Sequence, residues 1–514
     1  MTERLNRAVV PATGVVGRRE LVASFAVSMM AMLAASKGRA GPERPAPQPP
    51  DSLIKDAYIY GFAPVAAFAT ERIQTAVPDS TGIVGFAPLN QFAYATELAD
   101  ASFSTIIRPN ADTLYTLAWL DLNDQPMVIS LPEVKDRYYM MALLDAYTNQ
   151  FDSLGTRTTG SGAGDYLIAG PGRSGRPPLG ITQVISAPTP TIWVIGRTLV
   201  RGPGDLPAVL KVTIPEKGRD GYRLIPLDRY KGPATVFIPP TNVPVIAPEP
   251  QFVPPAGKPA TDAEGFREPI FFQAMQNWIA ANPPPSSQRS LVATFEEVFT
   301  NAVLLTPGIV NMALAAMLAE LEKIGRMVNG WGFLVGLGNY GDNFALRGAA
   351  ALIGLGANIP ADAVYALCEV DASNAPLDGS KRNYQIHFPR GKQPPVNPQA
   401  FWSITVYDQN GLLIDNPFLG KRYLRGSETN LVLAADGSVT IPLRHTPPPP
   451  SVPLANWLPV PNGPFNLTLR MYFPDTIALE TYVIPAVEVA APAPVPPPTQ
   501  RNPGIFQGAG GGFR

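Results

Sequence analysis

Proline is the residue that most restricts how this chain can fold. The sequence holds 59 prolines in 514 residues, which is about twice the usual share of roughly 5%. Proline lacks a backbone N–H donor and fixes φ, so it is poorly tolerated inside helices and central strands. Because Val, Ile, Phe and Tyr remain frequent, we expect short strands joined by rigid loops, which favours β-sandwiches over helical bundles.

Size and charge limit the class of protein further. Hydrophobic residues make up 46% of the chain and charged residues 16%, a balance that excludes disorder over the whole length and suits two or more domains. Beyond residue 40 there are 34 basic and 39 acidic residues without a basic stripe, so no nucleic-acid partner is expected. The single cysteine, Cys368, excludes an intrachain disulfide and a cysteine-built metal site.

The N-terminus has the pattern of an export signal. Arg18 and Arg19 precede an apolar run at 21–35, and Gly38 and Ala40 suit cleavage after residue 40. We therefore expect residues 1–40 to be a Tat-like signal peptide and the protein to be periplasmic or secreted. The alternative is a short membrane anchor, but the run is shorter than the roughly 20 residues needed to span a bilayer. No stable membrane span is expected after cleavage.

The first half of the mature chain reads as a β-rich domain. A proline-rich spacer at 41–50 leads into a domain at 51–232, which begins with a helix from Ser52 to about Gln74. Alternating or continuous apolar runs predict its main strands. These strands are expected at Leu114–Leu122, Pro126–Leu131, Tyr138–Asp145, Tyr166–Ala169 and Thr191–Val200.

A proline-rich connection at 233–259 leads to a helical section at 260–370. Thr306 is a plausible N-cap because Pro307 stands at the first helical position. Helices are expected at Ala260–Ala281, Ser290–Val303, Thr306–Val328, Tyr340–Leu355 and Pro360–Cys368.

The last section, 371–489, returns to β structure. Strands with apolar residues at every second position are predicted at Tyr384–Phe388, Trp402–Tyr407 and Phe465–Phe473. A tail at 490–514, rich in Pro and Gly, is expected to be disordered. The predicted fold class is α+β, with an N-terminal β-rich domain, a helical middle section and a C-terminal antiparallel β-sandwich.

Two distant segments resemble the paired signature of a known group of bacterial proteins. They are Arg108–Leu122 and Asn456–Pro474, and Tyr340–Ala350 extends the likeness into the helical section. Together they resemble proteins with an N-terminal DUF1254 domain and a C-terminal DUF1214 domain, which are families of unknown function. The resemblance implies a jelly-roll-like C-terminal domain and leaves the chemistry open.

Several common mechanisms lack their residues. Two histidines, His387 and His445, are too few for a histidine-rich metal centre, and no Gly-x-Ser-x-Gly elbow exists. The glycine-rich stretch at 160–164 is not followed by Lys-Ser/Thr, so it predicts a turn rather than a phosphate loop. The sequence therefore predicts no cofactor-binding residues and no metal ligands, and any cofactor is unknown.

The polar residues that remain form three clusters. In the first, Asp112 begins a strand that also carries Tyr115, and either Asn110 and Asp112 cap a turn or Asp112 reaches a cleft as an acid/base. In the second, Asp145, Thr148, Asn149 and Asp152 form a turn or bind a hard cation, with the turn preferred.

The third cluster follows the long C-terminal strand. Opposite its apolar stripe lie Asn466, Thr468, Arg470 and Tyr472. This face is predicted to be solvated or to contact another domain, and the alternative is a ligand site in which Arg470 clamps an anion or hydroxyl. Trp457 either plugs the edge of the sandwich or contacts ligand.

Two functions follow from these clusters. One is a hydrolase-like enzyme acting on an oxygen-rich small molecule or glycan between the two β-domains, with Asp112, Tyr115 and Arg470 catalytic. In this hypothesis Asn110, Tyr472 and Trp457 bind the ligand. The alternative is a non-catalytic protein that binds a carbohydrate-like ligand or assists assembly, and a homo-oligomer is compatible with either.

Overall fold

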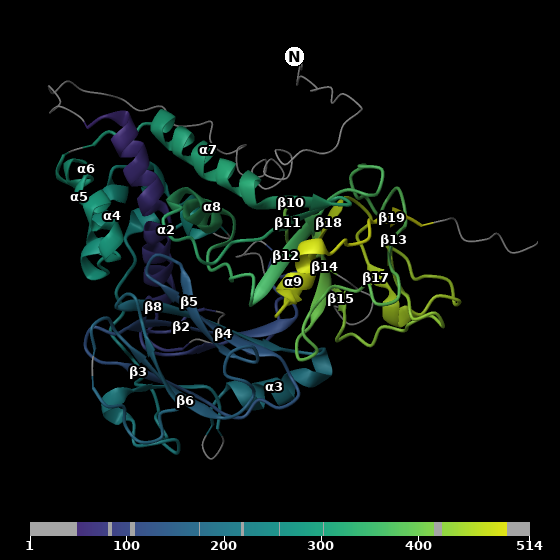
Figure 1. Ribbon diagram of the computed structural model, residues 1–514, viewed down its shortest axis with the longest axis horizontal. Coiled ribbons are helices and arrows are strands. Elements are labelled where there is room, and N and C mark those ends of the chain that lie inside the picture. Colours follow the sequence, from purple (N-terminus) through teal and green to yellow (C-terminus); the bar gives the residue numbers. More distant parts are fainter. Residues whose placement is uncertain are drawn as a thin grey trace, which may run out of the picture.

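A computed structural model shows two β-sandwiches and a group of helices (Figure 1). The predicted signal peptide, almost all of the spacer and residues 491–514 lie outside the described residues. None of the helices in the described part is long and apolar enough to cross a membrane. The structure describes residues 49–80, 85–102, 108–173, 175–216, 220–255, 258–301, 303–415 and 424–490.

The N-terminal sandwich consists of a five-stranded and a four-stranded sheet. The five-stranded sheet has the order β1-β2-β8-β4-β5 and is antiparallel throughout, and the other has the order β7-β6-β3-β9. Leu120, Met141 and Ile168 belong to the core between them. The strands are β1 Ala93–Tyr94, β2 Thr113–Asp121, β3 Met127–Leu131, β4 Tyr139–Asp145, β5 Gln150–Gly155, β6 Gly164–Ala169, β7 Gln183–Ser186, β8 Thr191–Leu199 and β9 Arg223–Pro226.

Helices cover the other face of the five-stranded sheet, so this sheet is buried on both sides. All seven residues of β4 are buried. Met140, Ala142 and Leu144 join the core beneath the helices, and the residues between them join the sandwich core. A strand buried on both faces reads as a continuous apolar run, which is why its sequence lacks polar alternation.

The long helix α2 lies at the centre of the helical layer. It is buried nearly all round, which is typical of a core helix. Figure 1 shows it standing over the N-terminal strands. The α-helices are α2 Asp51–Thr75, α3 Leu206–Thr213, α4 Ile270–Ala281, α5 Arg289–Ala293, α6 Glu296–Thr300, α7 Pro307–Ile324, α8 Phe344–Gly354 and α9 Thr476–Thr481. Short 3-10 helices are η1 Pro203–Asp205, η2 Leu227–Arg229, η3 Pro250–Phe252, η4 Ala260–Asp262, η5 Glu264–Arg267, η6 Ser286–Gln288 and η7 Leu454–Asn456.

The C-terminal sandwich pairs a six-stranded sheet with a four-stranded sheet. Their orders are β10-β11-β12-β18-β14-β15 and β17-β16-β13-β19. Ile404 and Leu469 of the larger sheet share a core with Ile441 of the smaller one. The strands are β10 Gly325–Val328, β11 Trp331–Leu334, β12 Ala363–Cys368, β13 Tyr384–Phe388, β14 Trp402–Asp408, β15 Leu424–Gly426, β16 Val439–Arg444, β17 Leu458–Pro459, β18 Phe465–Tyr472 and β19 Glu488–Val489.

The predicted α+β arrangement is confirmed, and so is the N-cap of α7. The Thr306 hydroxyl accepts a hydrogen bond from the Ile309 amide at 3.3 Å, and Pro307 follows it. Several helix predictions are wrong in type or extent. The helix predicted at 260–281 is two 3-10 helices followed by α4, and the one predicted at 290–303 is divided between α5 and α6. Residues 363–368 form β12, because Val364, Ala366 and Cys368 fill the sandwich core with a period of two. The helix predicted through Val328 ends at Ile324.

Three strands of the larger C-terminal sheet therefore come from the section at 260–370. They are β10, β11 and β12, and α8 connects β11 to β12. This connection places α8 against α2 and α7 while its two flanking strands lie in the other domain. The helical layer is thus continuous with both sandwiches.

Close packing of α2 against α4 gives a test of the helical layer. A Cβ at Gly61 would lie 2.3 Å from Met275 Sδ, so Gly61→Ala forces the methionine to move and should destabilise the protein by about 1–3 kcal/mol. Gly354→Ala is the matched control, because a Cβ there meets nothing within 4 Å and alanine favours a helix. Thermal denaturation should show a lower Tm for the first variant alone, and equal Tm values would contradict this packing.

Candidate functional site

The two sequence segments that carry the family likeness meet at the interface of the sandwiches. Residues 108–112 lie against the polar face of β18. Arg108 Nη1 donates to Asn466 Oδ1 at 2.5 Å, and Arg470 Nη2 donates to the Arg108 carbonyl at 2.9 Å. The Tyr407 hydroxyl donates to the Pro109 carbonyl at 2.6 Å. Side chains of the C-terminal domain therefore hold the backbone that leads into β2.

All eight residues of β18 are buried. Leu467, Leu469 and Met471 point into the sandwich core, so strand alternation turns Arg470 and Tyr472 toward the N-terminal domain. Of the predicted alternatives for this face, the interdomain contact is the one observed, and a solvated face is wrong. Burial follows because the 108–112 segment supplies the hydrogen-bond partners that a buried polar face requires.

Arg470 is bonded entirely within the protein. Besides the Arg108 carbonyl, its guanidinium donates to Thr405 Oγ1 at 3.0 Å and to the Tyr407 hydroxyl at 2.6 Å. Its Cζ atom lies 5.6 Å from the centre of the Tyr407 ring. The structure therefore gives this arginine the geometry of a residue that fixes the 108–112 segment.

Asn110 caps the turn that precedes β2. Its Oδ1 atom accepts hydrogen bonds from the amides of Asp112 at 2.5 Å and Thr113 at 3.3 Å. Its Nδ2 atom donates to Thr113 Oγ1 at 3.0 Å and to the hydroxyl of Tyr472. These hydrogen bonds match the prediction that Asn110 caps a turn. Its hydrogen bond to Tyr472 also joins the two domains.

Asp112 is placed differently, because its carboxylate reaches across the interface. Its side chain is 3% exposed, and Oδ2 accepts a hydrogen bond from Ser403 Oγ at 2.6 Å. Among the described residues, none donates to Oδ1. Burial raises the pKa of Asp112 above its ordinary value, although the charge of Arg470 and the Ser403 hydrogen bond lower it. A buried carboxyl with a raised pKa is suited to accept and release a proton.

A pocket of about 290 Å³ opens beside this carboxylate. Both domains contribute to its walls, which are largely apolar, and at its margin Arg201 Nε pairs with Glu428 Oε2 at 2.6 Å. The apolar lining residues include Leu98, Ala111, Leu199, Val200, Leu206, Phe401, Trp402 and Leu424. The polar lining residues are Asp100, Asp112, Arg201, Ser403, Glu428 and Thr429.

The structure brings only one of the predicted site residues to this pocket, which is Asp112. Arg470 and Asn110 lie behind it in the interface, and Tyr115 pairs with Arg197 of β8. Trp457 is buried in the C-terminal sandwich, where its Nε1 donates to the Arg444 carbonyl at 2.9 Å. Of these predicted site residues, the pocket therefore contains Asp112 but not Asn110, Tyr115, Trp457 or Arg470.

Tyr472 is buried in the same interface and does not line the pocket. Its ring stacks on Phe401 at a centroid distance of 4.6 Å and lies 5.5 Å from the Tyr138 ring. Ser403 lines the pocket and was missed in the sequence. The alternation of Ser403, Thr405 and Tyr407 along β14 marks a second polar face, which is the signal that points to it.

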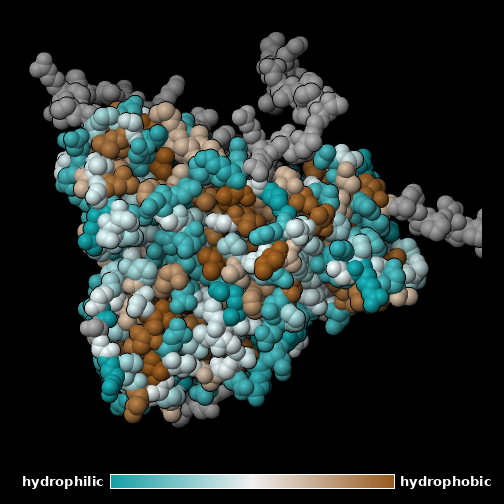
Figure 2. All heavy atoms as spheres, viewed as in Figure 1, coloured by the Kyte–Doolittle hydropathy of each residue, from teal (hydrophilic) through white to brown (hydrophobic). Residues whose placement is uncertain are grey.

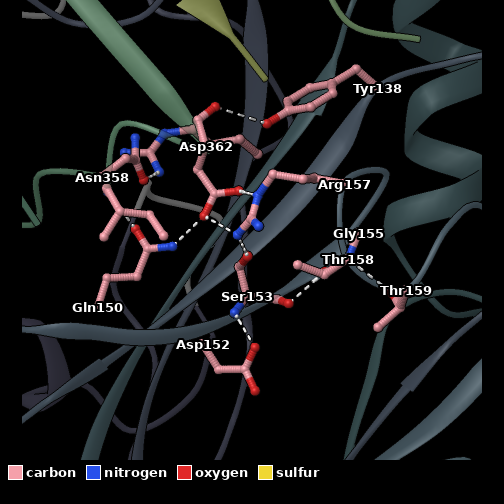
Figure 3. Close-up of polar contacts among 12 residues, drawn as sticks. Tyr138, Gln150, Asp152, Ser153, Gly155, Arg157, Thr158, Thr159, Asn358 and Asp362 are labelled. Carbon is pink, nitrogen blue, oxygen red and sulfur yellow. Dashed lines mark hydrogen bonds and ion pairs between the residues drawn. The ribbon is translucent and has the colours of Figure 1, made fainter. Parts of the chain in front are cut away.

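A second polar network joins the domains near β5 (Figure 3). The buried carboxylate of Asp362 accepts hydrogen bonds from Arg157 Nε at 2.6 Å and Nη2 at 3.1 Å, and from Gln150. Gln150 Oε1 in turn accepts from the Ile359 amide at 3.0 Å. The network fixes the loop before β12 against the five-stranded sheet.

The second predicted cluster forms the turn between β4 and β5. Asp145 Oδ1 accepts hydrogen bonds from the amides of Tyr147 and Asn149, both at 2.9 Å. Thr148 has a φ of 67°, as a tight turn requires, and Asp152 Oδ1 accepts from the Ser153 amide. No group of acidic, histidine or cysteine side chains among the described residues is arranged to hold a metal ion.

Two stretches of the chain match protein families, one in each of the two domains. Residues 89–226 match the family described as "Protein of unknown function (DUF1254)", and residues 362–476 match "Protein of unknown function (DUF1214)". Among the curated proteins, none matches.

Two solved structures are similar in fold. The crystal structure of the VPA0106 protein from Vibrio parahaemolyticus has a TM-score of 0.61 and 22% identity, over 86% of this chain and 100% of that one. A putative uncharacterized protein from Burkholderia cenocepacia has a TM-score of 0.42 and 12% identity, over 92% and 95% of the two chains. The first likeness shows a shared fold.

The raised pKa of Asp112 predicts a pH effect on stability. The unfolded chain releases this proton near pH 4, whereas the folded protein retains it to higher pH, so the free energy of unfolding falls across that window. Asp112→Asn removes this loss and keeps an acceptor for Ser403. We expect its Tm, relative to wild type, to rise as the pH increases from about 4 to about 7.

Thermal denaturation at a series of pH values measures this difference. The exposed Asp124→Asn is the matched control, since it replaces a carboxylate on the surface of the same domain. If the difference between Asp112→Asn and wild type stays constant across the series, burial does not retain the proton on Asp112.

Proposed function

Given that the chain carries a DUF1254 domain followed by a DUF1214 domain, we propose that it binds a small molecule in the pocket between them. The observation that carries this proposal is the Asp112 carboxylate, which is buried, bonded to Ser403 through one oxygen and without a donor from the described residues to the other. A ligand that donates a hydrogen bond to that oxygen completes the site.

The lining indicates the chemistry of this ligand. Apolar side chains form most of the wall, and two of the polar ones, Arg201 and Glu428, neutralise each other. A compact ligand with an apolar body and one or two hydroxyl or amine groups suits such a pocket. A long glycan would need polar partners along its whole length, so a small oxygen-bearing molecule is favoured over a polysaccharide.

The catalytic form of the proposal is a hydrolase-like reaction with Asp112 as acid/base. The raised pKa brings this carboxyl toward the range in which proton transfer is efficient, and Ser403 lies within hydrogen-bond distance of it. Arg470 positions the segment that carries Asp112. Export to the periplasm or cell exterior is part of this proposal, since the N-terminal sequence has a signal pattern.

A non-catalytic binding protein is the second candidate. It is favoured by Arg470, whose hydrogen bonds to protein acceptors leave the pocket without the charged clamp that the enzyme hypothesis assigned to it. Assembly into a homo-oligomer stays a prediction. On the face shown in Figure 2 the hydrophobic side chains form separate patches among hydrophilic ones rather than one broad apolar surface.

Ligand screening by thermal shift tests the pocket. Neutral alcohols, amines, sugars and small esters are added to the protein without its predicted signal peptide (residues 41–514). A ligand at about 100 times its Kd should stabilise the fold by about 2.7 kcal/mol. For a true ligand, Asp112→Asn should weaken affinity or abolish turnover, whereas the control Asp124→Asn should match wild type. A ligand indifferent to Asp112→Asn, or none in the panel, would contradict the proposed site.

Turnover of any ligand found then separates the two candidates. An enzyme should lose most turnover in Asp112→Asn while keeping much of its affinity, because the amide preserves the hydrogen bond with Ser403 and cannot transfer a proton. A binding protein shows no turnover in wild type. Ser403→Ala removes the other partner of this hydrogen bond and so tests the Asp112–Ser403 pair a second time.

A further inference from the structure

Arg197 is a buried arginine that pairs with no acidic side chain in the described part of the chain. It lies on β8, is 8% exposed and belongs to the interface of the sheets rather than to the pocket beside Asp112. Within the described ranges, no carboxylate lies within ion-pair distance of its guanidinium. A buried guanidinium stays charged, and an unpaired buried charge is costly. From this geometry we infer that Arg197 binds the carboxylate group of a small molecule.

The neighbouring Arg157 shows how such a group is held. Its Nε and Nη2 atoms donate to the two oxygens of Asp362, and Figure 3 shows Arg157 and Asn358 on either side of that carboxylate. Arg197 instead donates from Nη1 to Asn358 Oδ1 at 3.2 Å. Among the described residues its Nε–Nη2 edge, the one that Arg157 uses, has no acidic partner, although the Tyr115 side chain forms a hydrogen bond with this arginine. That edge matches a planar carboxylate in bidentate geometry.

Two tyrosines flank the guanidinium, of which Tyr115 is already a hydrogen-bond partner of Arg197 and Tyr365 offers a further donor. The Tyr115 ring lies under the guanidinium, with its centre 5.4 Å from Arg197 Cζ. The Tyr365 hydroxyl accepts a hydrogen bond from Asn358 Nδ2 at 2.7 Å, so its own proton is available to a ligand. Both tyrosines are half-buried, whereas Arg197 is buried. The arginine is therefore flanked by side chains that are partly exposed.

The charge balance of the interface supports an anionic ligand. Arg157 pairs with Asp362 and Arg108 with Glu369. Arg197 has no such partner among the residues that the structure describes. A ligand that accepts hydrogen bonds and carries one negative charge would balance it. Phosphate, with more charge, usually draws on several cations or backbone amides, so one arginine between two phenols favours a carboxylate.

A second buried arginine, Arg347, serves as a contrast. Its Cζ atom lies 5.0, 5.3 and 5.1 Å from the ring centres of Tyr60, Tyr147 and Phe344. It is 1% exposed, and the Asp145 charge acts on it. Aromatic rings and the Asp145 charge therefore accompany Arg347, whereas the rings beside Arg197 are half-buried.

Carboxylate binding can be measured directly on residues 41–514. Thermal shift and isothermal titration are run with sodium acetate and sodium benzoate, against acetamide, benzamide, sodium phosphate and sodium chloride at equal ionic strength. We expect stabilisation by the carboxylates alone. Arg197→Gln should weaken their binding about tenfold or more, since it removes charge-assisted hydrogen bonds, and Tyr365→Phe should weaken it severalfold.

Matched variants locate the effect. Arg201→Gln removes an arginine from the margin of the pocket, and Asp112→Asn alters the proposed small-molecule site, so both should keep the carboxylate response of wild type. This separates a failure of the Arg197 site from a failure of the proposed function. If Arg197→Gln does not fold, Tyr365→Phe decides, and its unchanged affinity would overturn the inference. The inference would also be overturned if Arg197→Gln and wild type responded equally to carboxylates, if Arg201→Gln rather than Arg197→Gln lost the response, or if wild type bound no carboxylate.

Discussion

The polar face of β18 is the feature on which the arrangement of the two domains depends. A central strand that buries one apolar face in its own sandwich usually leaves the other to water, yet here both faces are buried. Asn466, Arg470 and Tyr472 must then find partners in protein, and the 108–112 segment supplies them. Removing one partner leaves a buried polar group unsatisfied, so the two sandwiches are held in one relative position.

That fixed position creates the candidate site. The Asp112–Ser403 hydrogen bond joins residues 291 positions apart, and the pocket beside it has walls from both domains. Neither domain alone contains it. The same interface buries Arg197 with no acidic partner from the described residues, while it gives Arg157 the carboxylate of Asp362. The pocket and the anion site are thus two consequences of packing polar sheet faces against each other.

Local patterns in the sequence explain most of the elements. Alternation or continuous apolar runs indicate β2, β4, β8, β14 and β18, and Thr306 with Pro307 marks the start of α7. The prediction failed at 360–368, where a short apolar run fits a helix as well as a strand. Pairing of β12 with β11 and β18 decides in favour of the strand, and such pairing involves residues far away in the chain.

The sequence by itself determined the α+β class, the order of β-rich and helical sections and the choice of Asp112 as a candidate, because periodicity, capping and segment likeness are local properties. Only the tertiary structure decided that Arg470 holds a neighbouring segment, that Ser403 pairs with Asp112 and that Arg197 meets no counter-ion among the residues the structure describes. Each of these depends on which side chains meet across an interface, and burial and electrostatic pairing are set by distant parts of the chain.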